Sequence, residues 1–292
     1  MLKQTSRCSN LAWVSMITLC VLAGCKKAEE TKIEFAPYGE SYRDKPDFAQ
    51  VEHQFPIPRA ALQRLMPQDL EKFDQEQLDQ LYARLTAGPI PDGPFEGTII
   101  FAKGQGVKRL GEWLGGFKEL ALKFKARKLE IIGETLWKGK VFYRDQRVLR
   151  NRIEDLAVLK PIIDGELSSL PKITVKGRDA WLLFPAKLYC GQSLLDGRRE
   201  SIIIDYGFSD EIDGYRELPD FLAGRRGFKV RDEIRMIRPG FYLGRAYLDR
   251  FFALTFTLYN DEIAKREADA FVNGKIAEDC WVGTQQRVAV AK

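Results

Sequence analysis

Histidine is nearly absent from this sequence: a single one, His53, occurs among 292 residues. Ser-His-Asp and Cys-His catalysis, and zinc sites built from several histidines, therefore lose their usual residue. Other catalytic signatures are missing too, since Ser193 lacks the second glycine of a nucleophile elbow and Gly104-Gln105-Gly106 lacks the third glycine of a dinucleotide loop. We therefore expect no catalytic residue set, no metal site and no cofactor.

An excess of one charge is also missing. The chain has 46 basic and 41 acidic residues, for a formal net charge of +5. This balance gives no reason to expect nucleic-acid binding. Hydrophobic residues make up 45% of the chain, an ordinary fraction for a globular protein, so a sizeable core is available.

The N-terminus carries basic residues and then an apolar run from Leu11 to Ala23, which is long enough for a secretory signal but too short to span a bilayer. The run ends in Leu22-Ala23-Gly24-Cys25. This pattern resembles the lipobox of bacterial lipoproteins, in which the segment before the cysteine is removed and the cysteine carries a diacylglycerol. The resemblance implies a signal peptide over residues 1–24 and a membrane partner reached through lipidated Cys25. An ordinary signal peptide with an incidental thiol is the alternative.

Lys26 bears on the destination of the anchored protein, because that family often carries Asp at this position when it stays at the inner membrane. The resemblance therefore implies the periplasmic side of the outer membrane. After processing, Cys190 and Cys280 remain as the two cysteines without lipid. A disulfide between them is permitted in an oxidising compartment, and two buried free thiols are the alternative.

Residues 25–56 are charged and polar, with scattered prolines and no periodicity, which predicts a tether. Residues 57–88 read as a helical section, in which Pro67 can open one helix and Asp74 with Gln77 forms the capping box of the next. A basic amphipathic helix is expected at about 106–130, and it could pack on a sheet or lie on an anionic bilayer.

Residues 89–284 otherwise have the texture of an antiparallel β domain, with a C-terminal helix at about 260–272 and a loose tail over 285–292. Asp196-Gly197 between two apolar runs predicts a hairpin with a type I′ turn, and Pro239-Gly240 predicts a second hairpin. We expect an α+β fold, in which the helical section packs on an antiparallel β-barrel or a strongly curved meander sheet.

One short stretch adds a resemblance to a fold family. Trp137-Lys138-Gly139-Lys140-Val141-Phe142, followed by Asn151-Arg152, resembles the opening of the GXWXG lipid-associated barrels, and lipocalin-like calycins place Gly-x-Trp on their first strand. The preceding glycine departs from that pattern, since Gly133 lies four residues before the tryptophan instead of two. The resemblance implies a calycin-like barrel, and the residues alone place Trp137 in its core or at its mouth.

The second hairpin supplies the candidate site. A two-residue loop at Pro239-Gly240 predicts that Asp232 opposes Tyr247 and that Ile234 opposes Arg245, which places Asp232, Arg245 and Tyr247 on one mostly apolar face. Asp232 then needs Arg245 as its partner, because an unpaired buried charge costs several kcal/mol. A slip of one residue would exchange the two faces.

Two interpretations of that face stay open. Asp232 and Arg245 form a buried pair that fixes the strand register, or they hold the polar end of an apolar ligand in a site with Tyr247, Trp137, Asp205 and Tyr206. We expect an outer-membrane lipoprotein whose barrel binds a hydrophobic or lipid-like ligand. The alternatives are a structural or interaction lipoprotein with a solid core, and an envelope hydrolase with Asp205 and Asp232 as paired carboxylates.

Overall fold

The structure is a computed structural model that describes residues 32–100, 137–156, 159–160, 163 and 165–283. The expected signal peptide and Cys25, the expected amphipathic helix at 106–130 and the tail over 285–292 lie outside these residues. Within the described part of the chain, no helix combines the length and the apolar character needed to cross a bilayer.

The N-terminal section is helical, and its elements are the 3₁₀ turn η1 (Tyr42–Asp44), α1 (Phe48–Gln54), α2 (Arg59–Arg64), α3 (Pro67–Leu70) and α4 (Gln75–Ala83). Pro67 is the first residue of α3, where its missing N–H costs nothing. Asp74 and Gln77 cap α4 reciprocally, each side chain accepting the backbone N–H of the other residue. Both local signals in the sequence are therefore confirmed.

The expected tether over residues 25–56 differs from the structure in the part that the structure describes. Residues 33–55 are folded, with α1 inside them and with Ile33 and Val51 buried. Gln80 of α4 hydrogen-bonds both the backbone N–H and the carbonyl of Ala36, and Arg84 donates to the carbonyl of Glu34. The lack of hydrophobic periodicity in this segment suggested a tether. The segment is folded nevertheless, because its backbone is hydrogen-bonded to side chains of α4 and of Arg84, which lie 44 and 50 residues further along the chain.

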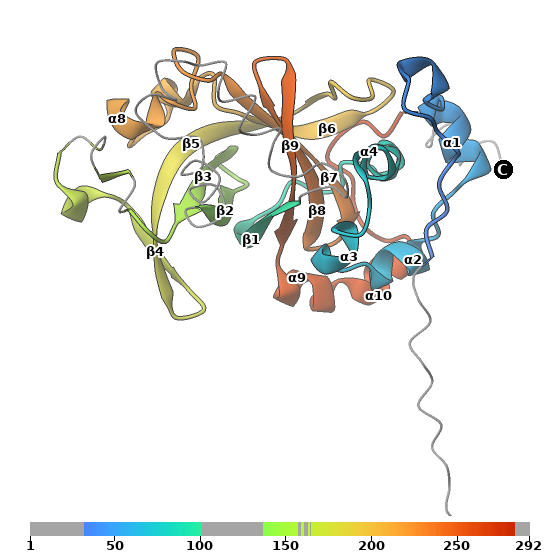
Figure 1. Ribbon diagram of the computed structural model, residues 1–292. Helices are drawn as coiled ribbons and strands as arrows, with labels where there is room; N and C mark the ends of the chain where they lie inside the picture. The colour runs from blue at the N-terminus through green and yellow to red at the C-terminus, as the bar shows by residue number, and fades with distance from the viewer. Residues whose placement is uncertain (1–31, 101–136, 157–158, 161–162, 164, 284–292) are drawn as a thin grey trace, which may run out of the picture. The chain divides into compact units, whose positions relative to one another are not determined.

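In the part of the chain that the structure describes, nine antiparallel strands follow: β1 (Gly93–Ile100), β2 (Trp137–Tyr143), β3 (Val148–Ile153), β4 (Lys172–Val175), β5 (Arg178–Gln192), β6 (Glu200–Asp205), β7 (Val230–Arg238), β8 (Phe241–Leu248) and β9 (Phe251–Tyr259). Their order is β3-β2-β1-β9-β8-β7-β6-β5-β4, and an extra pairing of β3 with β5 closes eight of them into a barrel. Strand β4 extends β5 outside the closed ring (Figure 1). The expected α+β fold with an antiparallel barrel is confirmed.

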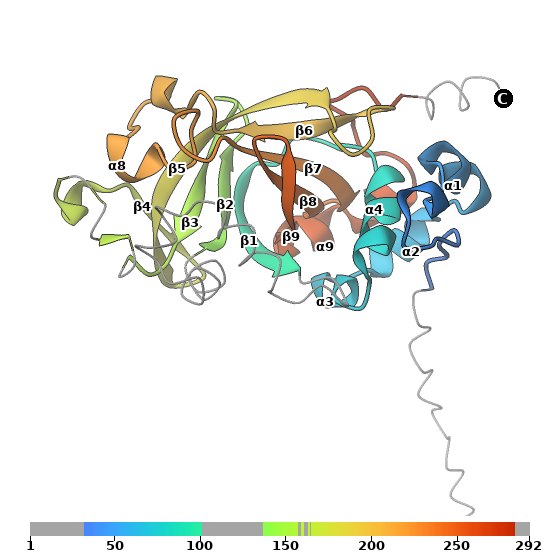
Figure 2. The same ribbon diagram turned by 45° about the horizontal axis from the view of Figure 1, so that its top comes forward.

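Short helices pack around the barrel. Helix α8 (Glu217–Asp220) contacts β5, and 3₁₀ turns occur at η3 (Leu167–Ser169) and η4 (Ser209–Glu211). The expected helix near 260–272 is two helices, α9 (Asp261–Arg266) and α10 (Ala268–Val272). Helix α10 lies against α2, which in turn contacts β7, so the last helix of the described residues meets the N-terminal helical section (Figures 1 and 2).

The predicted register of the β7–β8 hairpin is wrong by one residue. Pro239-Gly240 does form the two-residue loop, with Gly240 at a φ of 72°, and Arg238 opposes Phe241. The next pair is Met236 with Tyr242, so Ile237 is an extra residue that bulges from β7. Beyond the bulge Asp232 opposes Ala246 and Glu233 opposes Arg245, which exchanges the faces.

The other predicted hairpin has the right strands but the wrong turn. Strands β5 and β6 pair from Gln192 with Glu200, so seven residues, 193–199, connect them. Gly197 does not adopt a positive φ, and the type I′ turn is therefore absent. Asp196 instead points its side chain to Arg198 and Arg235, and this ion pairing outweighs the local turn preference.

Candidate functional site

The predicted site residues divide between the two faces of the barrel wall. Asp232 lies opposite Ile204 and Ala246, on the inner face. Tyr206 and Trp137 join it there, because the Tyr206 hydroxyl donates to Asp232 and the Trp137 ring packs edge-on against Phe256. The other three predicted residues, Arg245, Tyr247 and Asp205, lie on the outer face. The predicted Asp232–Arg245 pair is therefore wrong.

Inside the barrel, the partner of Asp232 is Lys140 of β2. The Lys140 Nζ atom lies 3.0 Å from Asp232 Oδ2, and both side chains are at least nine-tenths buried. Lys140 also donates to the Tyr206 hydroxyl at 2.7 Å and to Asn151 Oδ1 at 2.9 Å. All three N–H bonds of the ammonium group therefore have acceptors.

Asn151 of β3 organises the rest of this inner cluster. Its Oδ1 atom accepts from the Trp137 indole at 2.9 Å as well as from Lys140, and its Nδ2 atom donates to the Tyr206 hydroxyl at 2.9 Å. The same Nδ2 atom donates to the Phe184 carbonyl at 3.0 Å. The inner cluster, defined as Trp137, Lys140, Asn151, Tyr206 and Asp232, is thus an internally satisfied network.

Aromatic rings enclose the ammonium group of Lys140. Its Nζ atom lies 5.3, 5.4 and 5.5 Å from the ring centroids of Trp137, Tyr206 and Phe256. Burial on its own would lower the pKa of Lys140, but the Asp232 carboxylate and the Tyr206 hydroxyl outweigh it and raise the pKa above the ordinary value. Lys140 therefore stays protonated, and the Lys140–Asp232 pair carries no net charge.

The inward-facing side chains of the barrel are not equally buried along its length. Inward-facing apolar side chains on the side of the inner cluster are only partly buried; they are Trp137, Val230, Ala246 and Leu254. Two to four residues further along the strands, the inward-facing Ile234, Phe256, Leu258 and Tyr242 are at most 2% exposed. The inner cluster therefore lies at the end of the barrel that is less buried among the described residues, here called the open end, where Asp232 pairs with Ala246 and Ala246 with Leu254.

Phe184 marks the same region with a strained backbone. Its φ is 51°, a value that bulky residues rarely adopt. The backbone N–H donates to Asp220 Oδ1 at 2.7 Å, and the carbonyl accepts from Asn151. Burial raises the pKa of Asp220, although these backbone donors and nearby arginines oppose the shift. Two side chains thus hold β5 in a kink beside the cluster.

The outer face of β7 and β8 carries a second polar layer, which α4 covers. Arg245 pairs with Asp79 of α4, donates to the Tyr247 hydroxyl at 2.9 Å and stacks 4.1 Å from the Phe252 ring centroid. Arg235, fully buried, donates to Ser201 Oγ and to the carboxylate and carbonyl of Asp196. Arg245 and Tyr247 therefore belong to the contact between the helical section and the barrel.

Asp205 is separated from Asp232 by the barrel wall. It opposes Arg231 and accepts hydrogen bonds from the Tyr189 hydroxyl at 2.8 Å and from the Gly207 backbone at 2.7 Å, all on the outer side. Paired-carboxylate hydrolysis needs both groups to flank one bond. The two aspartates do not meet that requirement.

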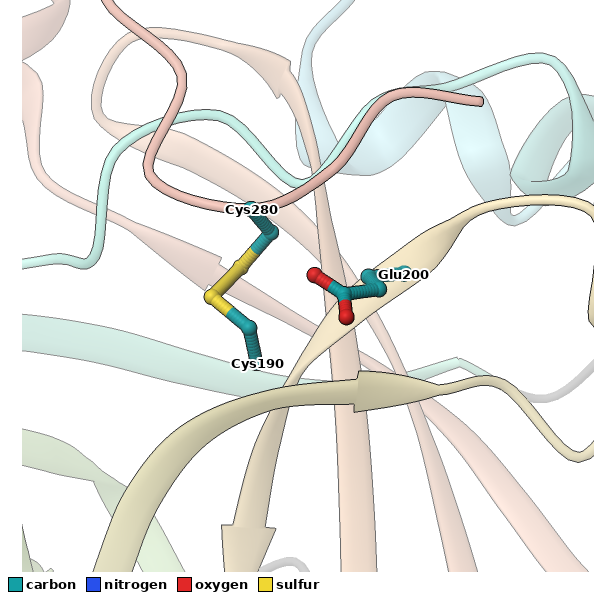
Figure 3. A group of neighbouring side chains, drawn as sticks. All are labelled: Cys190, Glu200 and Cys280. Atoms are coloured by element: carbon teal, nitrogen blue, oxygen red, sulfur yellow. A yellow bond between two sulfur atoms is a disulfide. The ribbon is translucent and has the colours of Figure 1, made fainter. Parts of the chain in front are cut away.

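Cys190 and Cys280 are joined in a disulfide, and Glu200 lies beside it (Figure 3). The sulfur and carboxylate atoms of this group lie within 4.8 Å of one another. Oxidised sulfurs do not bind a metal as thiolates do, and Glu200 Oε2 accepts from the Trp281 backbone. The group fixes the C-terminal segment to β5 and β6 and has no thiolate ligand to offer.

A surface pocket of about 210 Å³ lies elsewhere, on the outside of the barrel, between the ends of β1 and β9, α9 and β4. Its lining includes Glu96, Lys176 and Asp261 but none of the predicted site residues. The pocket is thus separate from the inner cluster.

Sequence reasoning missed Lys140 and Asn151. Lys140 stands two residues before the buried Phe142 in β2, so period-two alternation would have placed this lysine on an apolar face. Asn151 carried no such signal, because its role depends on the pairing of β3 with β2 and β5.

No known family, curated protein or solved structure matched the chain. The barrel is established by its strand pairing, and the likeness of Trp137 to Phe142 to the GXWXG barrels remains a resemblance.

Proposed function

We propose that the protein is a lipoprotein, anchored through Cys25 at the periplasmic side of the outer membrane, whose barrel binds a hydrophobic or lipid-like molecule at its open end. The observation that carries the binding role is the partial exposure of inward-facing apolar side chains beside the inner cluster. Barrels of about eight strands can hold one small ligand, and ligand sites combine apolar walls with a few fixed polar groups.

The residues at the open end suit this role. Trp137, Ala246 and Leu254 offer apolar contact. Beside them, the Lys140–Asp232 pair and Asn151 supply hydrogen-bonding groups that the surrounding strands hold in place. A lipid anchor would keep such a binder next to the bilayer that supplies or receives its ligand.

The test of binding starts with the protein purified from its own envelope. Native mass spectrometry should show a co-purifying lipid, and Ala246→Trp, which fills the open end, should remove at least nine-tenths of it. Thr98→Trp is the matched control, because Thr98 is exposed and lies on the outer side of β1. Arg245→Ala should keep the lipid, since Arg245 lies outside the barrel.

Two outcomes would reject the binding role. The wild-type protein could prove free of lipid and fail to take up an added one, which favours the alternative of a structural or interaction lipoprotein. Loss of lipid to the same extent in Thr98→Trp and Ala246→Trp would equally contradict a site at the open end. The anchor is tested separately: Cys25→Ser should move the protein from the membrane fraction to the soluble periplasm.

A further inference from the structure

The charge state of the inner cluster bears on the kind of ligand that the barrel can take. The three N–H groups of the Lys140 ammonium donate to Asp232, Tyr206 and Asn151. The Tyr206 hydroxyl accepts from Lys140 and Asn151 and donates to Asp232 at 3.4 Å. The cluster thus offers neither a free ammonium donor nor a net positive charge to an incoming anion.

The binding of an anionic head group beside the inner cluster would carry a large unfavourable free energy. A carboxylate brought beside the pair would lose its hydration, and the Asp232 carboxylate, 3.0 Å from the Lys140 ammonium group, would repel it. An unpaired charge in such a site is strongly disfavoured, and the group neutralises instead. A neutral hydroxyl, ester or amide avoids this cost, because it can exchange hydrogen bonds with Asn151 or Tyr206 without changing the charge.

We propose that the ligand of the barrel is an uncharged long-chain molecule, such as a fatty alcohol or an acyl ester, and that free fatty acids and other anionic lipids are discriminated against. The proposal rests on the proposed binding role and adds a class of ligand to it. The Lys140–Asp232 pair acts here as a positioning and selectivity element, since Asp232 holds the ammonium away from the ligand.

The test compares two molecules that differ in head-group charge, dodecan-1-ol and dodecanoate, titrated calorimetrically into the delipidated protein at pH 7.5. The alcohol should bind at least ten-fold more tightly. Dodecanoate should bind as the protonated acid, so its affinity should rise up to ten-fold for each unit of pH decrease, while that of the alcohol stays constant. The charged and titratable groups that face Lys140 in the structure are Asp232 and Tyr206. Burial raises the pKa of Tyr206 to about 12, so this hydroxyl stays protonated near neutral pH.

Asp232→Asn supplies the second arm, because it keeps the shape of the side chain and removes the carboxylate that pairs with Lys140, so that the carboxylate of a bound dodecanoate can take over this pairing. Affinity for dodecanoate should rise at least ten-fold, and affinity for the alcohol should change less than three-fold. Asp205→Asn, on the outer face, is the matched control and should change neither.

The outcomes separate this proposal from the one it rests on. Failure of both molecules to bind the wild-type protein would contradict the binding role itself. Equal or tighter binding of dodecanoate would overturn the selectivity while leaving binding intact, and so would a folded Asp232→Asn variant without a gain for dodecanoate. If that variant does not fold, the pH dependence of the wild-type protein decides the matter.

Discussion

The two faces of β7 and β8 hold charge in different ways. On the inner face one ion pair, Lys140 with Asp232, lies among aromatic rings and is complete within its own cluster. On the outer face several arginines share carboxylates and backbone carbonyls with α4 and with the 193–199 loop; Arg235 alone donates to the carbonyls of Tyr82, Asp196 and Arg199.

This difference indicates separate tasks for the two faces. The outer layer connects segments that are far apart in the sequence, so it fixes the helical section on the barrel. The inner cluster bridges only barrel strands and the residue that follows β6. Changes in the outer layer should therefore lower the free energy of unfolding more than changes in the inner cluster do.

The largest effect is expected from Arg235→Met. The substitution removes a fully buried guanidinium that donates to Asp196, Ser201 and three carbonyls, although Asp196 keeps Arg198 and Ser201 keeps the Tyr82 hydroxyl as donors. Removal of one member of a buried pair costs about 3–5 kcal/mol. The free energy of unfolding from urea titration measures it. Arg226→Met, which removes an exposed pair with Glu217, is the control and should leave that free energy unchanged. A loss below about 1 kcal/mol for Arg235→Met would remove the distinction between the faces.

A smaller effect is expected from Asp232→Asn, about 2 kcal/mol at pH 7, because the amide still accepts a hydrogen bond and Lys140 can lose its proton. Without Asp232, burial lowers the pKa of Lys140 in the folded state below its unfolded value. The unfolded state then binds more protons, so the variant should become more stable from pH 7 to pH 9 relative to the wild-type protein. Urea titrations at both pH values measure this slope; a flat difference would contradict it.

The smallest effect is expected at the N-terminus of α4, which carries part of the outer layer. Asp74→Ala removes the cap of Gln77 and should cost about 1 kcal/mol. Asp74→Asn keeps the acceptor and should cost much less. Thermal unfolding followed by circular dichroism can compare the two variants, and similar losses in both would show that the cap is not the cause.

Local signals in the sequence predicted much of the fold. The capping box at Asp74 and Gln77, the proline at the start of α3 and the loop at Pro239-Gly240 depend on neighbouring residues only, and all three are present. The tight turns between alternating strands predicted an antiparallel meander, although the turn at Asp196-Gly197 is absent, and the barrel was suggested by the resemblance to the GXWXG barrels. The three local features depend on residues that are close in the sequence, and local sequence patterns can therefore predict them.

The site was predicted less well, because it depends on long-range pairing. The bulge at Ile237 moved Asp232 and Arg245 to opposite faces, and no turn signal indicated it. Of the six predicted binding residues, the structure brings Asp232, Tyr206 and Trp137 together, and their true partners come from β2 and β3. A shift of one residue in strand register changes which side chains meet at such a site, whereas it leaves the barrel architecture unchanged.

Closure of the barrel through β3 and β5 has a consequence for a protein that is crowded on a surface. Sheets with long unpaired edges recruit neighbouring chains, and closure removes those edges. Among the strand pairings of the described residues, β4 alone pairs on one side; it is four residues long, begins at Lys172 and is followed by Lys176. Short length and like charge disfavour strand addition there, so copies held close together should not stack into fibrils.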